Sequence, residues 1–260
     1  KKTYKKGTIE QKLSDFYKLA LNVDARNKAG ISPVKPLLDE MEAAKTKADL
    51  QKIQLKYAAQ GYGVSFGGGF GADEKNVKMN IFNLGQGGLT LGQKDYYVNN
   101  DAATVAIREA FKKYVQKMFQ LYGFSAEEAA QKEQAIFQHE TMLALISKSM
   151  TELRDPQANY NKMTLKEFQE KYPNLNFEAM CNAEGIKSEY IQEMIVGQPD
   201  FLAGLDKITA AENDNTLRAL MEWDVIQSSS SYLTDEIREA NFDFFGKTMS
   251  GRKEDYPLWK

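Results

Sequence analysis

The sequence predicts a mainly α protein, a single helical unit of about nine to eleven helices with one small antiparallel β-hairpin. Three observations support this prediction. Apolar residues recur every three or four positions through most of the chain, which is the spacing of one buried helix face. Serine, threonine and asparagine residues that can cap helix N-termini precede several of these runs. Only the stretch around residues 62–84 combines dense glycine with alternating apolar residues, as a hairpin does.

The composition excludes several classes of protein. The chain has 260 residues, of which 42% are hydrophobic and 11% aromatic, so it can fill a sizeable core. The net charge of −2 is too balanced for a nucleic-acid binder. No run approaches the roughly eighteen apolar residues of a membrane span. A single cysteine, Cys181, excludes an internal disulfide and a multi-cysteine metal site, and it leaves the redox compartment open.

Three helices are expected before the hairpin. The first begins after the N-cap Thr8 and ends near residues 22–24, and a turn is expected at residues 27–32. The second begins at Pro33, because the first helical position needs no amide donor. The third follows Thr46. The apolar residues expected on their inner faces are Ile9, Leu13, Phe16, Ala20, Leu21, Leu37, Leu38, Met41, Leu50, Ile53 and Tyr57.

The hairpin is expected to pair residues 62–70 with residues 79–84 across a turn at residues 71–76. Glycine is too frequent in the first strand for a helix. The triplet Gly67-Gly68-Gly69 indicates either a bend or the close approach of another backbone.

Downstream of the hairpin the chain is expected to be helical again. A helix over residues 101–122 is followed by one that begins at the capping box of Ser125 with Glu128. That helix must end by Pro156, which removes an amide donor. The polar groups around Pro156 are expected at a packed junction between two helical halves. The later elements are a helix capped by Thr164 with Glu167, a short helix near 177–185, a short extended segment at 190–196, and helices after Pro199, Asn213 and Thr234.

The single histidine limits the chemistry that the chain can perform. His139-Glu140 opens the zinc-peptidase pattern H-E-x-x-H, but Leu143 stands where the second imidazole is needed. We therefore interpret His139 as a surface or packing residue. No serine or cysteine lies in a nucleophile elbow. Gly246-Lys247-Thr248 lacks the first glycine of a phosphate loop and follows a helical pattern. These residues predict neither a catalytic nor a metal site.

Four segments, taken together, resemble the neprilysin and endothelin-converting-enzyme family of zinc metallopeptidases. Each segment matches a family motif, and the four occur in the family's order. Their matching residues are Asp73, Lys75 and Asn76; Gln86, Gly88, Leu89, Asp95, Tyr96 and Tyr97; Arg154, Asp155, Pro156, Tyr160, Asn161, Met163 and Thr164; and Trp223. The first set is similar to the hairpin turn D-x-K-N, the second to Q-x-G-L-x-L and D-Y-Y, the third to R-D-P and Y-N-K-M-T, and the last to L-x-x-W.

The resemblance implies that residues 1–260 are the N-terminal, non-catalytic region of such a peptidase. In the family this region covers a chamber in front of the active site and limits substrates to peptides. Zinc and the catalytic residues belong to a later domain of the same polypeptide, so no cofactor is expected in this chain. Its expected partners are that domain and peptide substrates, not nucleic acid. The family implies a periplasmic, secreted or membrane-anchored parent, and the lone Cys181 favours a bacterial one.

Other functions remain compatible with the residues alone. A stand-alone helical module that binds peptides or a protein partner would need no catalytic residues. An unrelated enzyme that uses His139 would lose its activity in the variant His139→Ala. The chain begins at Lys1 with neither methionine nor an apolar leader, so we expect processing or excision from a longer polypeptide.

Overall fold

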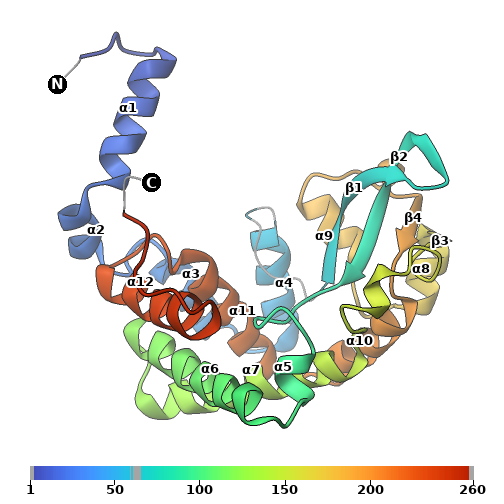
Figure 1. Cartoon of the computed structure of the whole chain (residues 1–260). Coiled ribbons are helices and arrows are strands. Elements are labelled where there is room, and N and C mark those ends of the chain that lie inside the picture. Colours follow the sequence, from blue (N-terminus) through green and yellow to red (C-terminus); the bar gives the residue numbers. More distant parts are fainter. Residues whose placement is uncertain (1–2, 59, 61–65, 258–260) are drawn as a thin grey trace.

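The computed structural model describes residues 3–58, 60 and 66–257 and confirms the mainly α class. Within these residues there are twelve α-helices and one four-stranded sheet, arranged as a crescent (Figure 1). One arm carries α3, α11 and α12, α6 and α7 form the base, and the sheet forms the other arm. The α-helices are α1 (Ile9–Ala20), α2 (Val23–Ala29), α3 (Lys35–Ala43), α4 (Lys47–Ala58), α5 (Asp95–Val98), α6 (Ala102–Leu121), α7 (Ala126–Ile146), α8 (Leu165–Lys171), α9 (Phe177–Ala183), α10 (Pro199–Ala211), α11 (Asp214–Ser229) and α12 (Asp235–Asn241).

The first helices differ from the prediction in two places. Helix α2 was not predicted, and it extends into the turn expected at residues 27–32; its N-cap Asn22 accepts a hydrogen bond from the amide of Ala25. Helix α3 begins at Lys35 with Pro36 in its first turn, not at Pro33. The reason is local: the amide of Val34 still donates to the carbonyl of Ile31 at 3.0 Å, so the chain around Pro33 forms a turn.

Helix α1 is capped as predicted but is not packed as predicted. The Thr8 side chain accepts a hydrogen bond from the amide of Gln11. The expected inner face is exposed, however, since Ile9, Leu13 and Phe16 keep 73%, 63% and 72% of their surface accessible. Figure 1 shows the reason, because α1 projects away from the rest of the molecule. The apolar spacing therefore predicted the helix but not its burial.

The predicted hairpin is part of a larger sheet. Strands β1 (Phe66–Asp73) and β2 (Asn76–Gln86) pair antiparallel, and the part of the expected first strand at residues 62–65 lies outside the described residues. Strand β4 (Glu193–Val196) runs parallel to β2, and β3 (Asn161–Thr164) pairs antiparallel with β4. The extended segment expected at 190–196 is confirmed. The predicted hairpin is present, and the sheet is larger than predicted because it includes β3, a four-residue strand that is too short to give an alternating pattern.

The central junction also differs from the prediction. Helix α7 has the predicted capping box but ends at Ile146, ten residues before Pro156. Ser147 ends it with an extended backbone conformation, and its hydroxyl donates to the carbonyl of Leu143 at 2.7 Å. Arg154, Asp155 and Pro156 are exposed instead of packed. They form a surface turn in which the Asp155 carboxylate accepts from the amides of Gln157 and Ala158 at 2.9 and 3.1 Å.

Two hydrophobic clusters meet at α7. We call the first the helical body, which consists of α3–α7, α11 and α12. The second is the sheet body, which consists of β1–β4 and α8–α10. Ala144 on α7 belongs to the helical cluster, whereas its neighbour Leu143 belongs to the sheet cluster. Leu89, in the loop after β2, packs against both. The segment after β2 and helix α7 therefore join the two bodies.

The C-terminal part is helical as predicted. Thr234 caps α12 by accepting from the amide of Ile237, and a π-helical segment, Phe242–Met249, continues it. The sequence ends on the large apolar residues Tyr256, Leu258 and Trp259, which predict contact with a partner surface, and Leu258 and Trp259 lie outside the described residues. None of the described helices combines the length and apolarity that crossing a bilayer requires.

Candidate functional site

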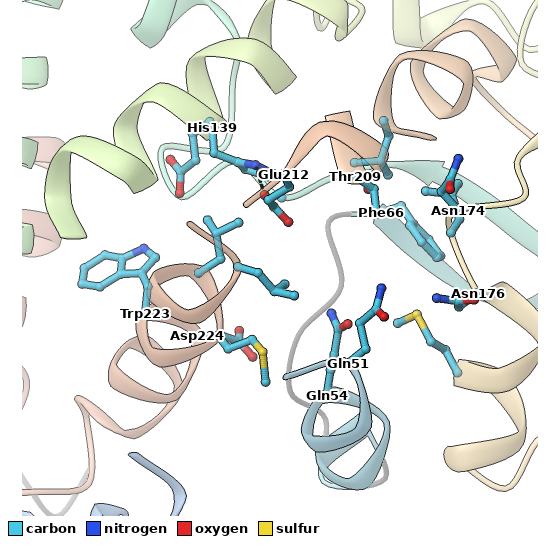
Figure 2. A pocket seen from close by; sticks show the side chains of 18 of the residues that line it. Gln51, Gln54, Phe66, His139, Asn174, Asn176, Thr209, Glu212, Trp223 and Asp224 are labelled. Carbon is cyan, nitrogen blue, oxygen red and sulfur yellow. Dashed lines mark ion pairs between the residues drawn. The ribbon is translucent and has the colours of Figure 1, made fainter. Parts of the chain in front are cut away.

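A pocket of about 290 Å³ lies where the two bodies meet (Figure 2). Its walls come from α4, the start of β1, the loop at 88–90, α7, the loop before α9, and α10 and α11. Gln51 and Gln54 project into it from α4, and Phe66 faces them from the start of β1. Both polar and apolar side chains line the pocket, as in sites that orient a ligand by a few polar groups.

A buried carboxyl group, Glu140, organises one wall. Its Oε1 accepts a hydrogen bond from the hydroxyl of Thr90 at 2.6 Å, and its Oε2 accepts one from the hydroxyl of Tyr97. The indole N–H of Trp223 donates to the Thr90 hydroxyl at 3.0 Å. The amide of Leu91 donates to the Tyr97 hydroxyl at 3.1 Å. This network connects α7, α5, α11 and the loop after β2.

Burial dominates the electrostatics of Glu140. It raises the pKa of Glu140 to about 7, although the hydrogen bonds from Thr90 and Tyr97 favour the ionised form. A buried carboxyl group of this kind is stable only while its donors remain in place. Glu140 therefore acts as a connector whose hydrogen-bonding capacity is used within the fold, not as a free acid or base.

His139 is the neighbouring polar group, and its 3% exposure excludes the surface position that the sequence left open beside a packing role. Its Nδ1 lies 2.8 Å from Oε1 of Glu212. The carboxylate lies off the direction of the ring N–H, so neither ring nitrogen has an aligned hydrogen-bond partner among the described residues. Leu143, in the position of the second zinc-binding histidine, is fully buried.

These residues do not fit a zinc ion. A catalytic zinc site needs three protein ligands, but Glu140 is committed to Thr90 and Tyr97. His139 and Glu212 remain beside each other, and two ligands are fewer than a catalytic zinc site needs. Within the described residues, no group of three or more histidine, cysteine, aspartate or glutamate side chains is placed to hold a metal ion.

The charge exposed to the pocket is mainly negative. Lys47 is the only lysine or arginine among the described lining residues, and its ammonium group donates to the carbonyls of Thr209 and Glu212, both at 2.7 Å. Lys47 thus satisfies carbonyls at the C-terminal end of α10. The carboxylates of Glu212 and Asp224 line the same space.

Three motif residues predicted from the sequence, Gly88, Leu89 and Trp223, line this pocket. Trp223 and the motif residue Tyr97 are joined through Thr90 and Glu140. Gly88 has a positive φ of 79°, which favours glycine. Gln86 lies at the end of β2. Its amide group donates to the carbonyl of Lys148 at 2.9 Å and accepts from the amide of that residue at 2.8 Å. Asp95 begins α5, and Tyr96 packs against the helical cluster.

The remaining motif residues form a second group at the hairpin. The Asp73 carboxylate accepts from the Lys75 amide and from the Tyr160 hydroxyl, both at 2.9 Å. The Lys75 ammonium lies 4.1 Å from the centre of the Tyr160 ring. Asn76 begins β2 opposite Asp73. Asn161 and Met163 lie in β3, and Thr164 caps α8. Because the Arg154-Asp155-Pro156 turn is exposed, the motif residues do not form one site.

Thr90, Glu140 and Glu212 were not predicted from the sequence to belong to a functional site. A signal existed for Glu140, because it lies four residues after Ile136 and four before Ala144, both on the buried face of α7. An acidic residue at an apolar-face position indicates a buried polar network. No comparable local signal points to Glu212, which follows the end of α10.

The sequence of this chain is similar to those of known peptidases. The profile of peptidase family M13 matches residues 1–260. Neprilysin-3 of Drosophila melanogaster is 24% identical over 274 aligned positions, which cover 98% of this chain and 35% of the relative. Endothelin-converting enzyme 1 of Homo sapiens is 26% identical over 192 positions, which cover 73% of this chain and 25% of the relative. The chain thus spans about a third or less of the length of these relatives.

Two solved structures have a fold similar to that of this chain. Zinc metalloprotease Zmp1 of Mycobacterium tuberculosis, in complex with an inhibitor, has a TM-score of 0.89 at 25% identity, covering 97% of this chain and 38% of that one. PepO of Lactobacillus rhamnosis has a TM-score of 0.78 at 20% identity, covering 96% and 39%. The second similarity supports the fold alone.

Proposed function

Since this chain belongs to peptidase family M13, as its sequence motifs predicted, we propose that it walls the substrate chamber of a zinc metalloendopeptidase. In this role the region is non-catalytic. It admits flexible peptides to an active site carried by other parts of the same polypeptide, and it keeps folded proteins out. The work is steric, so it requires a rigid shape and not a reactive group.

One observation supports this proposal most strongly. The chain aligns over almost its whole length with somewhat more than a third of a zinc metalloprotease, at a TM-score of 0.89. In addition, the His139–Glu140 pair, which superficially resembles a zinc-peptidase motif, is committed to packing and to the network of Thr90 and Tyr97. A metal-dependent activity would therefore need ligands from elsewhere.

The crescent has features suited to such a wall (Figure 1). The Glu140 network fixes α5, α7 and α11 relative to the loop after β2. The reciprocal pair of Gln86 with Lys148 fixes the end of β2 against the end of α7. Buried networks of this kind resist relative movement of the elements they join. The proposed partners are the catalytic domain and peptide substrates, and we place the parent enzyme outside the cytoplasm, as the family resemblance implies.

The test uses the parent enzyme and one cleavable sequence in three contexts. The sequence is presented as a free peptide, in a surface loop of a stable folded protein, and in a destabilised variant of that protein which is unfolded. We expect cleavage of the free peptide and of the unfolded carrier, and no cleavage of the folded one. Equal kcat/KM for the folded and unfolded carriers would contradict the proposed role. Zinc-dependent peptide hydrolysis by the purified 260-residue chain would contradict its non-catalytic character.

A further inference from the structure

Strand β1 forms an edge of the sheet that is open to a further strand. The strand order is β1-β2-β4-β3, so among the described residues β1 pairs with β2 alone. Its residues from Gly67 to Phe70 are exposed. An exposed edge strand presents unpaired amide and carbonyl groups, which proteins usually protect with charges, proline or a covering element. Strand β1 has no charged residue before Asp73 and no proline.

The hydrogen bonds of β2 identify the backbone groups that point outward. The amide of Gly197 donates to the carbonyl of Leu84 at 2.7 Å, so the backbone of Leu84 faces β4. Because successive residues of a strand alternate, the backbone of Asn83 faces β1 and bonds with its partner Gly69. The backbone groups of Gly68 and Phe70 therefore point away from the sheet, toward the open edge.

The glycines around this edge are only partly explained by packing. A Cβ on Gly68 would lie 2.7 Å from the Phe82 ring, so glycine is required there. A Cβ on Gly69 would meet no atom within 4 Å, and one on Gly67 only the Gln86 carbonyl at 4.0 Å. Neither glycine has a positive φ. Glycine weakens a strand, and its presence where the fold does not need it marks the close approach of another backbone.

The open edge leads into the pocket between the two bodies. Phe66, the first residue of β1, lines that pocket together with Glu212 and Asp224. The Lys47 ammonium group is bonded to backbone carbonyls. The ring of His139 is buried, and its Nε2 has no hydrogen-bond partner among the described residues. Apolar side chains such as Leu55 and Met180 complete the wall. A long side chain with an apolar stem and a basic end matches this lining.

We propose that β1 binds an extended peptide segment as an added strand, with a lysine or arginine side chain of that peptide in the pocket beside Glu212. Addition of a strand to a sheet edge is a general way to recognise peptide backbone, while side-chain pockets supply specificity. The inference rests on the proposed function and names the substrate class that this region of the chamber would hold.

The first part of the test asks whether the peptide backbone pairs with β1. Binding of a fluorescently labelled extended peptide with one lysine to the 260-residue chain is measured by anisotropy, beside the same peptide N-methylated at alternate residues. We expect the N-methylated peptide to lose about tenfold or more in affinity, as the loss of one or two hydrogen bonds implies. Equal affinity of the two peptides, or no binding of either, would overturn the proposal.

Phe70 offers a matched pair of variants for the same question. Phe70→Pro removes an amide that points outward and leaves the bonds between β1 and β2 in place, and edge strands tolerate proline there. Phe70→Ala removes the ring but keeps the amide. We expect Phe70→Pro to weaken binding about tenfold relative to Phe70→Ala, with circular dichroism unchanged. Equal binding by the two variants would overturn the proposal. Should Phe70→Pro alter the circular dichroism, the N-methylated peptide decides.

The second part of the test concerns the side-chain pocket. Glu212→Gln is compared with Glu193→Gln, a control on β4 whose carboxylate pairs with Lys162 on the surface. We expect Glu212→Gln to lower affinity for the lysine peptide about tenfold and to leave a norleucine peptide unchanged. An equal loss for both peptides would overturn the assignment of Glu212. Failure of these tests would not contradict the proposed exclusion of folded proteins, because the cleavage assay with folded and unfolded carriers tests that role separately.

Discussion

The helical body and the sheet body differ in how they expose polar groups. The helical body encloses carboxyl groups completely. Glu140 is 3% exposed, and Glu222 is 0% exposed with Oε2 2.7 Å from the Lys132 ammonium. Burial raises the pKa of Glu222 to about 8. The sheet body instead exposes backbone along β1, and its hairpin is held by Asp73, which is 5% exposed and accepts a hydrogen bond from the hydroxyl of Tyr160.

The difference separates two tasks within one chain. Enclosed carboxyl groups demand fixed donors, and these donors come from elements far apart in sequence, so the helical body acts as a frame. Exposed strand edges are costly in isolation but offer hydrogen bonds to a visiting chain. Under the two proposals above, the helical body supplies rigidity and the sheet body recognition, and α7 carries residues of both clusters.

The largest effect is expected from removing one core aromatic ring from each body. Trp223 packs against Phe111, Tyr114 and Phe119 in the helical body, and Phe168 packs against Phe177 in the sheet body. Trp223→Ala and Phe168→Ala should each lower the free energy of unfolding by about 3–5 kcal/mol. Because α7 is shared, urea denaturation followed by circular dichroism should show one transition in both variants. Two separated transitions would show that the bodies unfold independently.

The next effect is the dependence of stability on pH that Glu140 causes. Its pKa rises from the ordinary value of 4.5 to about 7 in the fold. The folded state therefore holds a proton that the unfolded state releases over this range. The stabilisation by this proton is fully present below pH 4.5 and is lost as pH rises through about 7. At about 1.4 kcal/mol per pKa unit, the loss is about 3 kcal/mol.

The variant Glu140→Gln isolates this contribution. Its neutral amide faces the donors of Thr90 and Tyr97, so the variant should be less stable than the wild type at low pH, and this difference should shrink as pH rises from 4.5 toward 7. The free energy of unfolding of the variant, measured by urea denaturation at several pH values between 4.5 and 7, should fall less steeply with pH than that of the wild type. A variant that kept the wild-type slope would refute the assignment of the proton to Glu140.

A smaller effect is expected from the hydroxyl of Tyr97. Tyr97→Phe leaves the Leu91 amide without its acceptor and Glu140 without one donor, which should cost about 1–3 kcal/mol. Tyr96→Phe is the matched control from the same motif, because Tyr96 contributes packing to the helical cluster. Thermal and urea unfolding of both variants measure the difference. Similar losses in both would show that the motif tyrosines act through packing, and the frame would not depend on the network.

The features that the sequence predicted best are those whose partners are close in the chain. The capping boxes of Ser125 with Glu128 and of Thr164 with Glu167 are both present, and each joins residues three positions apart. Pro199 begins α10 as expected. Such local hydrogen bonds and backbone restrictions act before any tertiary contact, so they can be identified from sequence alone.

The features that the sequence missed depend on distant partners. Strand β3 exists because Asn161 to Thr164 pair with β4, and four residues carry too little pattern to reveal it. The candidate site was missed for the same reason. Family motifs pointed to Tyr97 and Trp223, but Glu140, which joins them, lies in a separate helix. Resemblance therefore identified the residues, and only the fold identified what connects them.

Helix α1 provides the smallest expected effect and a limit to the comparison, since it belongs to neither body. Its spacing of Ile9, Leu13 and Phe16 predicted a buried face, yet Phe16 is 72% exposed. Substitutions at exposed sites change stability by about 0.5 kcal/mol or less, so Phe16→Ser should leave urea denaturation of this chain almost unchanged. A loss as large as that of Trp223→Ala would mean that α1 packs on the body in solution. In that case the helical spacing would have predicted the burial of α1 correctly, and α1 would be a third packed region in addition to the helical body and the sheet body.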